Sequence, residues 1–278
     1  MEVEKVALSI AGSDSGGGAG IQADIKTMSA IGLFGTSVIT SITAQNTQGV
    51  RDVFSLPLSL VASQLEAVFE DFHVSAVKTG MLSNGDIAHL LSEFLREHRV
   101  KNLVVDPVMI ATSGDRLTGN EVAQIYKKEL FPLSEVITPN IPECEWLLGY
   151  KITDISSMKQ AAKDLLSFGS ESVLVKGGHL PGKTMTDVWQ SRQSSEPVLI
   201  ESSYVETNNT HGTGCTLSSA IASYLALGNN VEYAVRMGIF YTHHAIRGGK
   251  HITIGKGHGP VQHFWNTKQG TLDKAITD

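Results

Sequence analysis

The sequence predicts an α/β fold in which a mainly parallel central sheet carries helices on both faces. Short, almost uninterrupted apolar runs alternate with stretches of helical periodicity, which is typical of strands buried on both sides. Glycine-rich or polar motifs follow those runs directly. The chain contains no internal repeat and no Pro/Ser-rich linker. We therefore expect one domain over residues 1–266, followed by a peripheral tail, 267–278.

The elements follow in a regular order. An apolar run at 6–11, a glycine loop at 16–20 and a helix that Gly32 ends form a first βα unit, and the apolar residues of that helix recur at helical spacing. Pro142 suits the first turn of a later helix that Gly149 ends. Further strands are predicted at 37–43, 75–78, 102–105, 136–138 and 173–176, edge ribbons at 184–203, and further helices at 59–70, 85–96, 214–227 and 231–247.

Composition excludes several classes of protein. The 278 residues are 41% hydrophobic with a net charge of -6, so a large core is possible, and neither nucleic acid nor an anionic membrane is the expected partner. Two cysteines cannot form a disulfide framework, and ten histidines show no zinc-site spacing. The start has no signal-peptide pattern, and no apolar run reaches the roughly 18 residues of a membrane helix. We expect a cytoplasmic protein.

A glycine turn before a long apolar helix is the first candidate site. Gly212, Thr213 and Gly214 open this helix, and backbone amides at a helix start can hold an anion or a developing phosphoryl charge. The same field should lower the pKa of Cys215 below the value of about 8.5 for a free thiol, which would make it a candidate general base or nucleophile. The alternative is a tight turn beside a small buried cysteine.

Other candidates also follow predicted strands, where open parallel sheets bind ligands. Asp106 and Glu143 could hold magnesium beside phosphates, or could serve as a turn residue and a helix-end charge. Lys176 could neutralise a phosphate, or merely flank a strand. The Gln45 amide offers a donor and an acceptor that suit an aminopyrimidine edge, although a turn residue is the alternative. The glycine loop at 16–20 matches neither the dinucleotide nor the Walker pattern.

Seven motifs in order resemble the hydroxymethylpyrimidine and hydroxymethylpyrimidine-phosphate kinases of thiamine biosynthesis, members of the ribokinase-like superfamily. These motifs are AGSDSGGGAGIQAD (11–24), TAQNT (43–47), KTGM (78–81), DPVM (106–109), TPNIPE (138–143), KGGH (176–179) and NTHGTGCT (209–216). The resemblance runs from about residue 5 to Phe264 and includes GKGHGPV (255–261).

The resemblance implies a single ribokinase-like domain, often a homodimer, that uses ATP and Mg²⁺. Its substrates would be 4-amino-5-hydroxymethyl-2-methylpyrimidine and then the monophosphate of that alcohol. Cys215 takes the position at which sugar kinases of the superfamily carry an aspartate base. The backbone of Ala19 and the side chain of Gln45 would hold the pyrimidine, Gly12, Asp24, Met81 and Val108 would line the pocket, Asn140 and Lys176 would serve ATP, and Asp106 and Glu143 would serve magnesium.

The sequence departs from the family pattern at one place and leaves rivals open. Thr112 stands where the family commonly has a lysine before Ser-Gly-Asp, so the second phosphorylation must use another cation, such as Arg116, or none. The nearest rival is a pyridoxal or pyridoxine kinase. A cysteine acyl-transfer enzyme built on Cys215 and His211, and a binding module without turnover, are the other two alternatives.

Overall fold

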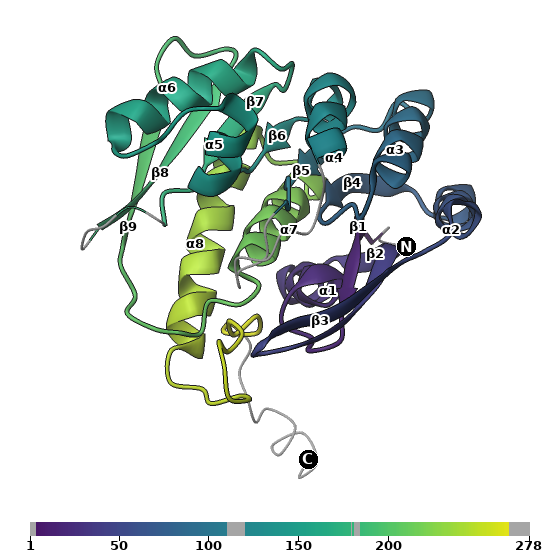
Figure 1. The fold of residues 1–278 in the computed structure, drawn as a ribbon, viewed down its shortest axis with the longest axis horizontal. Coiled ribbons are helices and arrows are strands. Elements are labelled where there is room, and N and C mark those ends of the chain that lie inside the picture. The colour runs from purple at the N-terminus through teal and green to yellow at the C-terminus, as the bar shows by residue number, and fades with distance from the viewer. Residues whose placement is uncertain (1–3, 110–119, 179, 181–183, 267–278) are drawn as a thin grey trace.

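Nine strands form one sheet in the computed structural model, which describes residues 4–109, 120–178, 180 and 184–266 (Figure 1). Across the sheet the order is β3-β2-β1-β4-β5-β6-β7-β8-β9. The central strands pair in parallel, whereas β3 at one edge and β8 and β9 at the other are antiparallel. The predicted α/β class is confirmed. The strands are Val6–Asp14 (β1), Phe34–Asn46 (β2), Gly49–Ser55 (β3), Val74–Thr79 (β4), Leu103–Val105 (β5), Val136–Ile137 (β6), Ser172–Val175 (β7), Thr184–Ser191 (β8) and Val198–Ser203 (β9).

Helices cover both faces of this sheet (Figure 1). One face carries α1, α7 and α8, whose buried residues form a core with Ala7, Val104 and Leu174 of the sheet. The other face carries α2 to α6, which share a second core with the strands. The helices are Gly20–Ile31 (α1), Leu58–Asp71 (α2), Gly85–Glu97 (α3), Asn120–Ile125 (α4), Ile141–Leu148 (α5), Ile155–Leu166 (α6), Thr213–Ala226 (α7) and Val231–Gly249 (α8).

Adjacent strand residues enter opposite cores, because successive side chains of a strand point to opposite faces. In β1, Ala7 packs with α1 and α7 whereas Leu8 packs on the other face. In β6, Val136 and Ile137 divide in the same way. Both faces are apolar environments, so these strands appear in the sequence as continuous apolar runs.

Among the described strands and α-helices, three do not appear among the sequence predictions, namely β3, α4 and α6. The short π-helix Tyr126–Leu130 and 3₁₀ helix Phe131–Leu133 were not predicted either. Most residues of β3 are exposed, so it lacks an apolar run. The start of α6 has a local signal: Asp154 and Ser157 form a capping box, and Met158, Ala161 and Leu165 are buried at helical spacing. The strand β1 also continues to Asp14, beyond the predicted end at residue 11, and therefore reaches the glycine loop.

Some sequence predictions fall outside the described residues. They concern the tail, 267–278, the departure at Thr112 with its neighbour Arg116, and the histidine that ends the KGGH motif. The boundary at residue 266 stays a prediction. None of the helices in the described part of the chain has both the length and the apolar character of a membrane span.

Candidate active site

A cavity of about 540 Å³ lies beyond the carboxyl ends of the parallel strands. Its wall contains residues that follow β1, β4, β5, β6 and β7, together with the first turn of α7. Parallel strands end at the same edge of a sheet, so segments far apart in sequence meet here. The predicted site residues that line it are Gly12, Ala19, Gln45, Met81, Asp106, Val108, Asn140, Glu143, Lys176, Gly212, Thr213, Gly214 and Cys215.

The glycine loop after β1 is organised by the carboxylate of Asp14. Its Oδ1 accepts a hydrogen bond from the amide of Gly16 at 2.8 Å, and its Oδ2 accepts from Gly18 at 3.1 Å and Ala19 at 2.8 Å. Nε2 of His211 lies 2.9 Å from the same Oδ2. Burial opposes ionisation of Asp14, but the bonds from His211, Ala19 and Gly16 outweigh it and lower the pKa of this carboxyl.

The Asp14→Asn variant should be less stable than the wild type at neutral pH by about 1–3 kcal/mol, because Oδ2 would lose its acceptor role. A carboxyl whose pKa is lowered in the folded state stabilises the protein above its unfolded pKa of about 4 and loses this contribution on acidification. The difference between variant and wild type should therefore shrink as the pH falls below about 4. Urea unfolding of both proteins across this pH range measures the difference in the free energy of unfolding. A difference that does not change with pH would contradict the role of the ionised Asp14 carboxylate.

The first turn of α7 lies between the glycine loop on one side of the cavity and Lys176 and Asp106 on the other. Gly212 adopts a φ of +82°, and a side chain there would overlap the carbonyl oxygen of Gly18, so the two loops meet backbone to backbone. A Cβ on Gly214 would lie 3.4 Å from Nζ of Lys176 and 3.6 Å from Oδ2 of Asp106. Among the described residues the amides of Gly214 and Cys215 have no backbone acceptor, as is usual at a helix start. This turn can therefore bind an anion beside Lys176.

Cys215 lies in the cavity wall, but its thiol is not acidified. Burial raises the pKa of Cys215 to about 11, the charge of Lys78 opposes this rise, and the carboxylates of Asp24 and Asp106 add to it. The prediction of a lowered pKa is wrong, because the helix start is accompanied by burial and two negative charges. The resting residue is a thiol.

The ammonium of Lys176 and the carboxylates of Asp106 and Glu143 form a buried cluster on the side of the cavity away from the glycine loop. Nζ of Lys176 lies 2.9 Å from Asp106 Oδ1 and 3.9 Å from Glu143 Oε2, and both carboxylates are almost completely buried. Burial raises the pKa of Glu143 to about 7; Lys176 opposes the rise and the charge of Asp106 adds to it. Burial also disfavours the charge on Lys176, but Asp106 and Glu143 raise its pKa overall.

Asn140 and Glu143 also have a structural role at the start of α5. Oδ1 of Asn140 accepts from the amide of Glu143 at 2.9 Å, and Oε2 of Glu143 accepts from the amide of Asn140 at 2.7 Å. This reciprocal pair is a capping box, so the helix-end alternative for Glu143 describes part of what the residue does. Both side chains still border the cavity.

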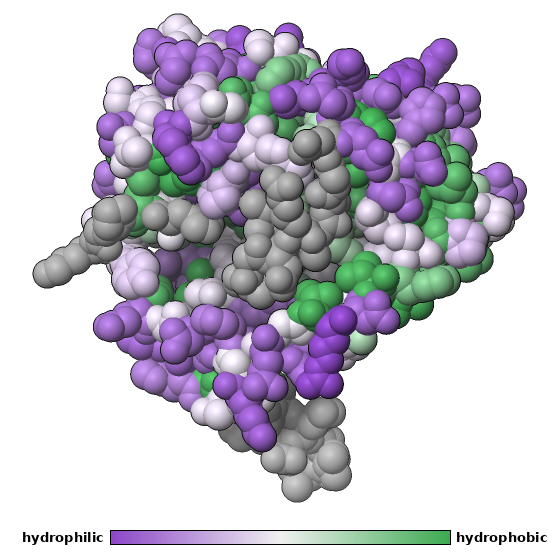
Figure 2. All heavy atoms as spheres, in the orientation of Figure 1, coloured by the Kyte–Doolittle hydropathy of each residue, from purple (hydrophilic) through white to green (hydrophobic). Residues whose placement is uncertain are grey.

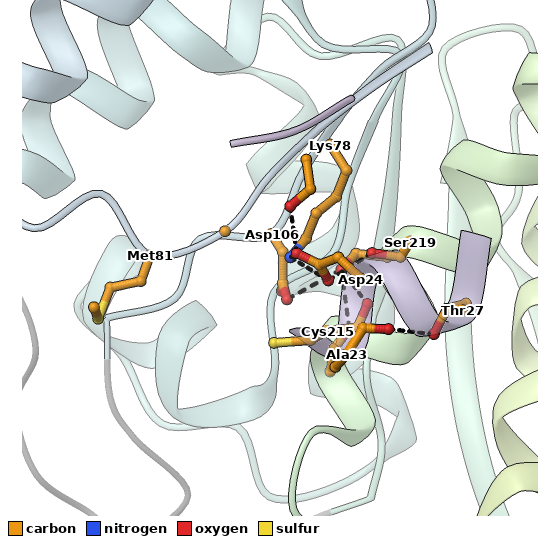
Figure 3. Close-up of polar contacts among 12 residues, drawn as sticks. Ala23, Asp24, Thr27, Lys78, Met81, Asp106, Cys215 and Ser219 are labelled. Carbon is orange, nitrogen blue, oxygen red and sulfur yellow. Dashed lines mark hydrogen bonds and ion pairs between the residues drawn. The ribbon is translucent and has the colours of Figure 1, made fainter. Parts of the chain in front are cut away.

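Asp24 is the one predicted site residue that does not line the cavity. It is completely buried, and its oxygens accept hydrogen bonds from Nζ of Lys78 at 2.9 and 2.8 Å, from Ser219 at 2.6 Å and from Ser9 at 2.5 Å (Figure 3). Lys78, from β4, lies in the cavity wall instead. The expected lining role of Asp24 is corrected, because its side chain supports Lys78 from behind.

Several residues that belong to this region were not among the predicted site residues. Asp14 has a visible signal, an aspartate directly before a glycine run, because such a carboxylate commonly accepts from the amides that follow it. Asp187 on β8 borders the cavity and accepts from the amide of Gly177 at 2.8 Å, but nothing in its polar sequence surroundings indicates this. Lys78 begins the KTGM motif (78–81), but no role was predicted for it from the sequence.

His211 has a different partner from the one that an acyl-transfer enzyme would need. Its Nε2 pairs with Asp14, and Nε2 of Gln45 lies 3.5 Å away. Oε1 of Gln45 accepts from the Thr43 hydroxyl at 3.2 Å. Within the described part of the chain no hydrogen bond joins His211 to the sulfur of Cys215, so the geometry does not support a cysteine–histidine pair.

A parallel sheet with a helix start that can bind an anion, a Lys–Asp–Glu cluster and a neighbouring glycine loop defines the class of ribokinase-like small-molecule kinases. The family model for phosphomethylpyrimidine kinase matches residues 14–262. The chain belongs to the phosphomethylpyrimidine kinase family. ATP is the phosphoryl donor that this family implies.

Known proteins with full-length similarity support the same assignment. A hydroxymethylpyrimidine/phosphomethylpyrimidine kinase of Rhizobium meliloti is 47% identical, over 93% of this chain and 97% of its own. The crystal structure of phosphomethylpyrimidine kinase from Clostridium difficile 630 is 46% identical with a TM-score of 0.77, and the match covers 87% of this chain and all of that one. A pyridoxal kinase from Staphylococcus aureus in complex with AMP-PCP and pyridoxal is 30% identical with a TM-score of 0.88, covering 96% of each chain.

Proposed function

We propose that the protein phosphorylates 4-amino-5-hydroxymethyl-2-methylpyrimidine and then its monophosphate, with ATP as donor, in thiamine diphosphate biosynthesis. The contact that carries this proposal is made by the start of α7. Gly212 packs on the glycine loop that would hold the pyrimidine, and Gly214 faces Lys176 and Asp106, which would receive the nucleotide phosphates. A phosphoryl group passing from ATP to the pyrimidine would therefore lie on this turn.

In the first reaction the hydroxymethyl oxygen attacks the γ-phosphorus in line, and the leaving group is ADP. Catalysis of this kind depends on positioning and on neutralising charge. The amides of Gly214 and Cys215 and the ammonium of Lys176 would stabilise the transferring phosphoryl group. The alcohol must also lose its proton. Because the resting Cys215 is a thiol, only the minor fraction of the enzyme in which this residue is a thiolate would accept that proton.

In the second reaction the acceptor is a phosphate monoester, whose second pKa is about 6. Its attacking oxygen is already ionised at neutral pH, so this reaction needs no general base. The phosphoryl-binding groups are needed in both reactions, whereas Cys215 is needed mainly in the first.

The donor set fits magnesium. Mg²⁺ in phosphoryl-transfer sites is commonly held by one or two carboxylates together with substrate phosphates and water. Asp106 and Glu143 supply two neighbouring buried carboxylates whose mutual repulsion contributes to the raised pKa of Glu143, so a divalent cation would be favoured there. When bound, the ion would neutralise charge on the donor phosphates, and Asn140 would border the same site.

The direct test is an ADP-release assay on the full chain with three acceptors: the pyrimidine alcohol, its monophosphate and pyridoxal. We expect turnover of both pyrimidines, with a kcat/KM above that for pyridoxal. Pyridoxal is included because the pyridoxal kinase fold matches this chain closely. A preference for pyridoxal would replace the proposal by its rival, and absence of turnover with every acceptor would leave the binding-module alternative.

The Gln45→Met variant should bind the pyrimidine more weakly by about 1–3 kcal/mol, because polar edges of the ligand would lose their partner. Methionine keeps a similar length without the amide. Isothermal titration with the pyrimidine alcohol measures the change, and titration with a non-hydrolysable ATP analogue provides the control, which should be unaffected. Unchanged pyrimidine affinity would show that the Gln45 amide does not face the ligand.

We also propose a cytoplasmic homodimer. Exposed apolar side chains on the edge hairpin and the helix that follows it support self-association, and Figure 2 shows apolar surface on this side of the molecule. These side chains are Ile42, Val53, Phe54, Leu58 and Leu60. Sedimentation of the full chain, compared with a Phe54→Ser variant, would test the dimer.

A further inference from the structure

A buried ion pair that the mechanism above does not use lies next to the catalytic cysteine. Lys78 and Asp24 are both completely inaccessible to solvent, and the Nζ of Lys78 contacts both oxygens of Asp24. Hydroxyl groups of Ser9 and Ser219 complete the surroundings of the carboxylate. The pair therefore joins β4 to β1, α1 and α7 in the centre of the molecule.

Stability gives no sufficient reason for this pair. The free-energy cost of removing two charges from water is about as large as the gain from their attraction. Replacing a buried ion pair by well-packed apolar residues therefore often leaves the stability unchanged or increases it. The lysine lies in the cavity wall, whereas the aspartate lies behind it. The arrangement therefore places the positive end of the pair next to the site.

The charge of Lys78 acts on Cys215. Figure 3 shows the side chains of Lys78 and Asp24 meeting close to Cys215 and Asp106. Of the charges that act on the sulfur, Lys78 has the largest effect and favours the thiolate, while Asp24 and Asp106 oppose it and Lys176 also favours it. Asp24, helped by Cys215 and Asp106, outweighs burial and raises the pKa of Lys78, so the lysine stays charged at neutral pH.

We propose that Lys78 is a positioning residue of the first phosphorylation: its buried ammonium favours the thiolate of Cys215, and Asp24 holds that ammonium in place. The O–H bond of the alcohol breaks as the oxygen attacks phosphorus, and its proton moves to the sulfur, which becomes a neutral thiol. Gly80 makes room for this arrangement, since a Cβ there would lie 2.8 Å from Nζ of Lys78. The inference rests on the proposed function for its role in turnover, but not for its effect on the thiol.

Alkylation of Cys215 by iodoacetamide tests the proposal without any substrate. The full chain is treated at fixed, mildly alkaline pH, and the rate is measured by mass spectrometry of the Cys215 peptide, with the buried Cys144 as internal reference. Lys78→Met should slow alkylation by about tenfold or more, because the thiolate loses the positive charge that favours it most. Asp24→Asn should slow it as well, because burial would then lower the pKa of Lys78 and remove the charge that favours the thiolate.

The direction of the change in alkylation rate separates this role from a structural one. Loosening of a shared network would expose the sulfur and accelerate alkylation in both variants, which would overturn the proposal. Because Lys78→Met leaves Asp24 buried without its partner, the double variant Lys78→Met/Asp24→Asn keeps the test valid if the single variant does not fold. It should also react more slowly than the wild type, and a wild-type rate would contradict the assignment. Ser219→Ala, which removes a hydroxyl but no charge, is the matched control.

Activity provides an independent readout. Lys78→Met should lower kcat for the pyrimidine alcohol more than kcat for its monophosphate, because only the alcohol must lose a proton. Equal losses in both reactions would overturn the role in turnover. If the protein phosphorylates neither pyrimidine, the proposed function fails, whereas the alkylation result still decides whether Lys78 controls the thiol.

Discussion

The Cys215→Ala variant is expected to lose about 100-fold or more of kcat with the pyrimidine alcohol, and less than about tenfold with the monophosphate. Alanine removes the proton acceptor but leaves the backbone amides of the α7 turn in place. The alcohol depends on that acceptor, whereas the monophosphate is already ionised. Steady-state kinetics with each acceptor supplied separately measure the two losses.

Cys144→Ala is the matched control for this experiment. Cys144 is the other cysteine of the chain and is buried on α5, outside the cavity wall. Its replacement should leave the ratio of the two activities unchanged. Equal losses with both acceptors in Cys215→Ala would remove the general-base role and leave Cys215 as part of the pocket wall.

The Lys176→Met variant should lose about 100- to 1000-fold of kcat in both reactions, the range seen when a stabilising group at a developing negative charge is removed. Lys176 is the cation that separates Asp106 from Glu143, and it faces the start of α7. Without it, two buried carboxylates would repel each other and the donor phosphates. Each acceptor should be affected to a similar extent, in contrast to Cys215→Ala.

Lys151→Met is a suitable control, because Lys151 is exposed and pairs with Glu145 on the surface. That variant should keep both activities. The decisive comparison is the ratio of kcat for the pyrimidine alcohol to kcat for its monophosphate. If Lys176→Met lost activity only with the alcohol, Lys176 would act on the acceptor alcohol. Retention of both activities would place the donor phosphates elsewhere.

The sequence predicts much of the fold because the central strands are buried on both faces. Their apolar runs are visible without knowledge of their neighbours, as in β1, where Ala7 and Leu8 enter different cores. The exposed edge strand β3 has no such pattern and was missed. The capping box and buried positions of α6 were available in the sequence, so that helix could have been predicted.

The candidate site was predictable to the extent that it follows strand ends. This rule brought Asp106, Asn140 and Lys176 to one cavity. Asp24 was expected in the pocket from the family resemblance alone, and a resemblance does not show which member of a buried pair borders the cavity; the structure places Lys78 there. The sequence also could not show the state of the Cys215 thiol, because the opposing charges come from elements distant in sequence.

The contact between Gly212 and Gly18 has a consequence for how the two substrates bind. The backbones touch without intervening side chains, so a movement of either loop is transmitted to the other. An acceptor that orders the glycine loop would then leave less conformational entropy for the nucleotide to lose on binding. The two substrates are expected to bind synergistically, and by linkage the enhancement of affinity is the same in either order of addition.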